Sequence, residues 1–295
     1  MSLSVKIDTS FVIPLLKYLG GSKETDIYSI TDHPAARQVY SHALRFNNTK
    51  KGTVQEFWKD ITKDLSKDYK VLVSRVKSAL TYLYNETQSF DLMIKDLWNY
   101  IPNGTKLRCE LYAMLGYDIG IVSEGHALIN LAHPLFEKDP REILYLSMHE
   151  LHHVVYTSFN PIYDLKNIFT IENLVEMIKY STHLEGLAVY AALEARKRTK
   201  SFSHPDYQVL QDTGKRNSLV TEFFNILTKL EFDKIRSVHE NDWNTIELMS
   251  DKKRLWYIAG AHMAEVIDKK LGRDALNDTI RHGPNEFFKS YHDSL

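Results

Sequence analysis

One short segment constrains this chain more than any other. Residues 141–157, REILYLSMHELHHVVYT, contain HELHH at 149–153, which is an HExxH motif. On an α-helix, positions i and i+4 lie on one face about one turn apart, so His149 and His153 can direct their imidazoles at one point. Glu150 is offset by about 100° from His149, beside that face. The segment therefore predicts a helix with one chemically active face.

The surrounding residues predict where this helix runs. Asp139-Pro140 supplies an N-cap and a first-turn proline, which predicts a helix over 140–157. His152 lies about 60° from His149, at the edge of the active face, and we expect it either to be partly exposed or to support a metal ligand from behind. Apolar side chains recur at helical spacing on the opposite side and predict a core face: Leu144, Met148, Leu151 and Val155.

This spacing suits a zinc hydrolase, which needs two neutral nitrogen ligands and a carboxylate base. We therefore expect His149 and His153 to bind Zn²⁺. We expect Glu150 to act as the general base that takes a proton from a metal-activated water. The alternative is a surface helix rich in His and Glu, in which the motif is fortuitous.

A catalytic zinc site has three protein ligands, so a third ligand must come from elsewhere in the chain. The downstream candidates are His183, Glu185 and Glu194. On a helix over 182–199 these three side chains point in different directions, and only one can face the metal. Glu185 is the expected ligand, because it shares a face with small side chains that permit close helix packing: Ala188, Val189 and Ala192.

An alternative reading of Glu185 is structural. Thr182-x-x-Glu185 also matches a capping box, in which Glu185 only accepts a hydrogen bond from the Thr182 amide at a helix start. The ligand role is favoured, because the HExxH motif leaves a coordination position that a carboxylate would fill.

Short β-prone segments precede the motif helix. Within 107–133 they are separated by Gly116, Gly120 and Gly125, and they predict a small antiparallel sheet. The Ala127–His133 run is the expected sheet edge, where an extended peptide can add as a further strand. Most of the remaining chain has helical patterns.

Composition excludes several classes of protein. Hydrophobic residues make up 43% and charged residues 25%, as in globular proteins, and the net charge of −1 gives no general attraction to nucleic acid or anionic membranes. No apolar run is long enough to span a bilayer. Cys109 is the only cysteine, which excludes an intramolecular disulfide and a thiolate metal cluster. The expected location is cytoplasmic, and nothing in the sequence indicates the oligomeric state.

HExxH at 149–153, followed by EGLAVYA at 185–191, resembles the gluzincin group of zinc metallopeptidases, the thermolysin-like arrangement. The chain is most similar to families known only as predicted zinc-dependent proteases. The resemblance implies zinc bound by His149, His153 and Glu185, Glu150 as general base, and a peptide or protein substrate. Metzincins need Gly and a third His shortly after the motif, and this chain has neither there.

The expected fold class is therefore α+β and mainly α. We expect an N-terminal helical region over 1–105, which begins with an amphipathic helix in residues 1–21. A zincin-like catalytic region would follow over 106–295. It would contain the sheet at 107–133, the motif helix at 140–157, the third-ligand helix at 182–199 and C-terminal helices.

Gluzincin-like enzymes often stabilise the developing oxyanion with a Tyr or His from a later helix. Residues 255–262 contain both, and Tyr257 is the expected donor, because it shares a helix face with Gly260, Ala261 and Ala264. A buried tyrosine with a satisfied hydroxyl is the alternative. Two other functions remain open: a catalytically inactive zinc-binding scaffold, and a helical interaction protein.

Overall fold

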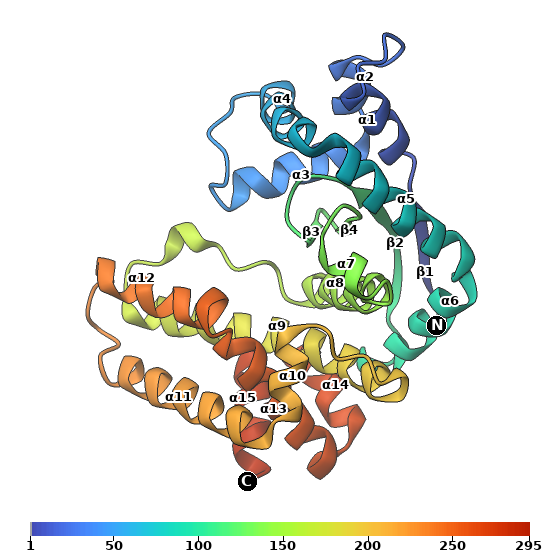
Figure 1. The fold of residues 1–295 in the computed structure, drawn as a ribbon. Helices are drawn as coiled ribbons and strands as arrows, with labels where there is room; N and C mark the ends of the chain where they lie inside the picture. Colours follow the sequence, from blue (N-terminus) through green and yellow to red (C-terminus); the bar gives the residue numbers. More distant parts are fainter. Residues whose placement is uncertain (1) are drawn as a thin grey trace. The chain divides into compact units, whose positions relative to one another are not determined.

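A computed structural model describes residues 2–295, whose elements fall into two compact units. Unit 1 comprises Met1–Ile94 and Lys106–Val154, and unit 2 comprises Lys95–Thr105 and Val155–Leu295. Figure 1 traces the elements along the chain. The division passes through two helices, α6 (Thr87–Leu97) and α8 (Glu142–Phe159).

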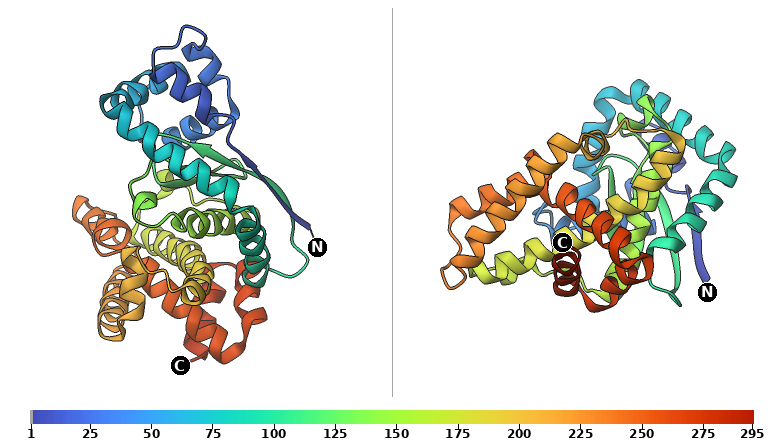
Figure 2. Two further views of the ribbon diagram at one scale, coloured as in Figure 1. Left: turned by 45° about the vertical axis from the view of Figure 1, so that its right-hand side comes forward. Right: turned by 90° about the horizontal axis from the view of Figure 1, so that it is seen from below.

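A four-stranded mixed sheet lies in unit 1, with the order β1-β2-β4-β3. The strands β1 (Ser2–Asp8), β2 (Lys106–Met114) and β4 (His126–Asn130) run parallel, and β3 (Gly120–Ser123) pairs antiparallel with β4. β1 and β2 lie side by side in Figure 2. The β3–β4 hairpin turns at Glu124-Gly125, where both φ angles are positive, as two-residue hairpins of the favoured hand require.

The sheet differs from the predicted one in three ways. It is mixed rather than antiparallel, and residues 2–8 form β1 where an N-terminal helix was predicted; the helix α1 begins only at Val12. The alternation of Val5 and Ile7 is a strand signal, but the partner strand lies about a hundred residues further along the chain. The prediction that Ala127–His133 is a sheet edge is wrong, because β4 has neighbours on both sides and β3 is the edge.

Helices cover both faces of this sheet. Ile7, Leu111 and Ile129 point to one face, where they line a small apolar cavity together with Leu83 and Ile143 of two helices. α3 packs against β2 and β3. The helices of unit 1 besides α6 and α8 are α1 (Val12–Leu19), α2 (Ile27–Thr31), α3 (Pro34–Arg45), α4 (Val54–Leu65), α5 (Tyr69–Asn85) and α7 (Leu135–Lys138).

Unit 2 is helical and is organised around the packing of α9 (Ile171–Thr199) against α13 (Leu255–Leu271). The two backbones meet at Gly186 and Gly260, where a Cβ on Gly260 would lie 2.7 Å from the Gly186 Cα. Only glycine permits this approach. The other helices are α10 (Pro205–Gln211), α11 (Thr213–Phe232), α12 (Glu240–Glu247), α14 (Arg273–His282) and α15 (Pro284–Asp293).

Candidate metal centre

The middle of α8 carries both motif histidines. His149 and His153 lie one turn apart, and their ring centroids are 4.4 Å from each other at an interplanar angle of 78°. His153 is buried and His149 is half-buried. Asp139 starts this helix, since its carboxylate accepts a hydrogen bond from the Arg141 amide at 3.1 Å. The local sequence thus places two imidazoles together on one face in the middle of α8.

Glu150 lies against the first residue of β3. A Cβ on Gly120 would lie 2.5 Å from the Glu150 Oε1 and 2.9 Å from its Cγ, both closer than real contacts allow. The absent side chain at position 120 therefore provides the space in which the Glu150 carboxylate sits, and Glu150 is itself buried. From the sequence alone, Gly120 was expected only to separate two strands. The position of Gly120 at the start of a strand was the one sequence feature that could have indicated a contact with Glu150. The pairing of the strands would have had to be known to interpret it.

The expectation that His152 is partly exposed is wrong. Its side chain is 1% exposed, and every residue from Glu150 to Tyr156 is buried. The helical pattern predicted one core face, but this part of α8 is enclosed on more than one side. His152 is therefore a buried residue and not a surface histidine.

Glu185 lies in the interior of a continuous helix, which excludes the capping-box alternative. α9 begins at Ile171, and its capping box is formed by Thr170 and Asn173. Thr182 lies three turns inside this helix, where its Oγ1 donates to the Ile178 carbonyl at 2.7 Å. Glu185 is half-buried and has no helix start to cap.

The other two candidates for a third ligand make different contacts. His183 is buried, with its Nδ1 3.0 Å from the Tyr156 hydroxyl and its Nε2 3.0 Å from the Thr279 Oγ1. Its ring stacks on Phe287. Glu194 accepts a hydrogen bond from Lys197 at 2.7 Å. The contacts of His183 join α9 to other helices, whereas the contact of Glu194 is with a neighbour on α9 itself.

Tyr257 lies one turn before Gly260 on α13. Its surroundings keep the phenol hydroxyl protonated. Burial raises the pKa of the Tyr257 hydroxyl, the nearby Glu185 carboxylate raises this pKa further, and the Arg254 guanidinium partly offsets the rise. The phenol is therefore neutral across the physiological range and can act as a hydrogen-bond donor. Glu185 on α9 and Tyr257 on α13 both belong to unit 2.

The chain belongs to the family described as "Putative zinc dependent peptidase (DUF5700)", whose model matches residues 30–294. That description confirms the prediction of Zn²⁺ as the cofactor and implies a peptide or protein substrate. No curated protein and no solved structure matches the chain. Among the described residues, no helix has the length and apolar character needed to cross a bilayer.

Proposed function

We propose that this chain is a zinc peptidase of the gluzincin type, in which His149, His153 and Glu185 bind the zinc ion. The observation that carries the proposal is the chemistry of this group. Each residue offers one ligand atom, and these atoms lie within 4.8 Å of one another. Two imidazole nitrogens and one carboxylate oxygen form a donor set typical of catalytic zinc, with one coordination position left for water or substrate.

Zinc, when bound, supplies a Lewis acid that activates water and polarises a carbonyl. Glu150 is the general base in this proposal: its carboxylate takes the proton from the attacking water and delivers it to the leaving amine. Tyr257 donates a hydrogen bond to the carbonyl oxygen as negative charge develops there. The burial of Glu150 against Gly120 supports this role, because it limits the positions that the carboxylate can adopt.

Metal analysis combined with turnover tests the proposal. The wild-type protein, purified without added metal, should contain about one zinc per chain and should cleave members of a mixed peptide library, with cleavage abolished by a chelator. Glu150→Gln should keep the zinc and lose at least about 100-fold in kcat. Glu185→Ala should lose zinc, whereas Glu194→Ala, which removes a carboxylate from the same helix, should keep it.

The outcomes separate the alternatives. Bound zinc without turnover would indicate a catalytically inactive scaffold, and absence of zinc would indicate a helical interaction protein with a fortuitous motif. An active Glu150→Gln variant would refute the role of Glu150, and full zinc content in Glu185→Ala would refute that of Glu185.

A further inference from the structure

Tyr257 has an arginine stacked on its ring. The Arg254 guanidinium carbon lies 3.6 Å from the centroid of the Tyr257 ring. The Nε of the same guanidinium donates to both carboxylate oxygens of Asp206, at 2.8 and 2.7 Å. Asp206 is buried, so this ion pair is shielded from water on one side. The guanidinium is thus held in one orientation over the ring.

The backbone at Arg254 also adopts an unusual conformation. Arg254 is the N-cap of α13 and has φ of 51°, in the left-handed region that is unfavourable for a residue with a side chain. Such a conformation persists where the surrounding contacts determine it. From this position the side chain contacts Asp206 and Tyr257, and its Nη1 also donates to the Ser250 carbonyl at 3.5 Å. A helix start that served only to begin α13 would not need an arginine there.

The indole N–H of Trp256 is a second group that acts on the Tyr257 phenol. The indole Nε1 of Trp256 is buried and has no hydrogen-bond partner among residues 2–295. The rings of Trp256 and Tyr257 lie 6.3 Å apart between centroids, and the Trp256 side chain partly offsets the rise in the pKa of the Tyr257 hydroxyl. A cation over the ring and an N–H beside the oxygen both stabilise negative charge on the phenol, so each makes the O–H a stronger donor than it would be without them.

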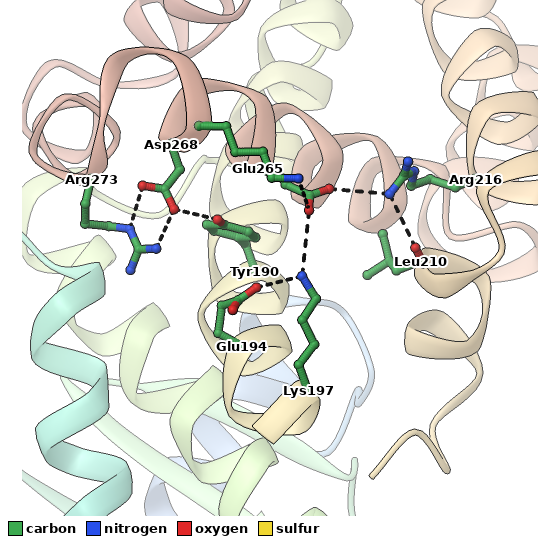
Figure 3. Close-up of polar contacts among 9 residues, drawn as sticks. Tyr190, Glu194, Lys197, Leu210, Arg216, Glu265, Asp268 and Arg273 are labelled. Atoms are coloured by element: carbon green, nitrogen blue, oxygen red, sulfur yellow. Dashed lines mark hydrogen bonds and ion pairs between the residues drawn. The ribbon is translucent and has the colours of Figure 1, made fainter. Parts of the chain in front are cut away.

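Two other arginines of unit 2 stack on tyrosines and provide a comparison. The Arg273 guanidinium lies 4.0 Å from the Tyr100 ring centroid and donates from its Nε to Asp268 at 2.9 Å. Asp268 also accepts a hydrogen bond from the Tyr190 hydroxyl at 2.5 Å, as Figure 3 shows. This network joins helices of unit 2. Arg196 similarly lies over Tyr207, at 3.9 Å.

We propose that Arg254 is a positioning residue for Tyr257. Stacked on the phenol and held by Asp206, Arg254 keeps the ring beside Glu185 with its hydroxyl directed to the carbonyl oxygen of a peptide substrate. This inference rests on the proposed function, in which Tyr257 is the oxyanion donor. The Glu185 carboxylate acts on the hydroxyl of Tyr257, whereas Glu194 and Asp268 are the carboxylates that act on that of Tyr100.

A double-mutant cycle tests whether Arg254 acts through Tyr257. Arg254→Met keeps much of the side-chain volume and removes the charge. It should lower kcat about 10- to 100-fold with KM changed less than about threefold. In a Tyr257→Phe background the same substitution should cost less than about twofold, because its target hydroxyl is already absent. The affinity of a phosphinic pseudopeptide, a mimic of the tetrahedral intermediate, should show the same non-additivity.

Arg273→Met is the matched control. It removes an arginine with the same type of carboxylate and tyrosine contacts, and it should lower the melting temperature while kcat stays within about twofold of wild type. Asp206→Asn should reproduce the effect of Arg254→Met in the same direction. If Arg254→Met does not fold, Arg254→Lys, which keeps the charge but loses the planar stack, takes its place in the cycle.

Equal losses from Arg254→Met in the wild-type and Tyr257→Phe backgrounds would overturn the inference while leaving the proposed function intact. So would a loss of kcat in Arg273→Met as large as that in Arg254→Met. A wild-type protein with neither zinc, nor phosphinic pseudopeptide binding, nor hydrolysis would instead overturn the proposed function, and this inference with it.

Discussion

At the scale of single residues, the absence of a side chain at Gly120 matters as much as the presence of the Glu150 carboxylate. Glu150 fills the space that a Cβ at position 120 would occupy. A catalytic carboxylate must be placed accurately, since a misplacement of about 1 Å can cost about 100-fold in rate. Gly120 is therefore part of what places the proposed general base.

We expect Gly120→Ala to lower kcat about 100-fold while the zinc content stays near that of wild type. The new methyl group displaces the Glu150 side chain, which is flexible enough to move without unfolding the protein. Steady-state hydrolysis of a library peptide, with metal analysis and a thermal melt, measures the three quantities. Gly52→Ala, at an exposed site with no atom closer than 3.8 Å, is the control. Unchanged kcat in Gly120→Ala would show that Glu150 tolerates the displacement.

His42 shows how burial sets the charge state of one residue in unit 1. Burial, with a smaller contribution from the nearby Arg45, lowers the pKa of His42 from 6.5 to about 4. Its Nδ1 lies 3.2 Å from the Tyr117 hydroxyl, and its ring packs on Phe46 at 4.6 Å. The folded state therefore holds His42 neutral at a pH where the unfolded chain would protonate it.

This difference predicts a pH dependence of stability. Because the pKa of His42 is lower in the folded protein than in the unfolded chain, the unfolded chain binds more protons between about pH 4 and pH 6.5. The contribution of His42 is thus full above about pH 6.5 and is lost as the pH falls towards 4. It amounts to up to about 3 kcal/mol. Urea denaturation of wild type and His42→Gln from pH 7 to 4 should show a shrinking difference in unfolding free energy.

At the scale of elements, the packing of α9 against α13 determines the arrangement of unit 2. The contact at Gly186 and Gly260 lies next to Glu185 in the sequence and one turn after Tyr257. A shift of either helix would therefore move a proposed ligand relative to a proposed donor. The polar network in Figure 3 joins α9 and α13 further along, through Tyr190 and Asp268 and through Lys197 and Glu265.

Gly260→Ala should destabilise the protein, although alanine is normally the better helix former by about 1 kcal/mol. The new Cβ would collide with the Thr182 carbonyl and with the Gly186 Cα, both backbone atoms that cannot move aside alone. We expect a loss of about 1–3 kcal/mol in unfolding free energy, measured by urea denaturation. Gly214→Ala on α11, whose nearest atom is 3.4 Å away, should be neutral or slightly stabilising. Equal effects of the two substitutions would contradict the close approach.

At the scale of the whole molecule, the proposed zinc site takes two ligands from α8 and one from α9, so zinc should act as a folding ligand. A ligand that binds the folded state alone raises the free energy of unfolding by about 2.7 kcal/mol at 100 times its Kd. Adding zinc to the metal-free protein should therefore raise its melting temperature. Glu150→Gln should keep this shift, and Glu185→Ala should reduce it. A zinc-independent melting temperature in wild type would contradict the proposed site.

Local pattern predicted the helices of this chain closely. Most of the remaining chain was predicted to be helical, and it forms helices such as α4 (Val54–Leu65) and α5 (Tyr69–Asn85). The motif helix predicted over 140–157 corresponds to α8. Apolar spacing, caps and breakers act within a few residues of each other, so one sequence contains the information needed to find a helix. The HExxH residues were identified for the same reason, since their spacing is a property of one helix.

The tertiary structure decided what depends on distant partners. Strand β1 forms because β2, about a hundred residues away, pairs with it. β4 lies between β2 and β3 in the sheet, an order that differs from the order along the chain because parallel partners need not be neighbours in sequence. The burial of His152, the space at Gly120 and the stack of Arg254 on Tyr257 likewise arise from contacts between separate segments. The sequence by itself determined which residues have the chemistry for a zinc site. Only the packing of distant segments decided what surrounds them, because burial and close approach depend on the whole fold.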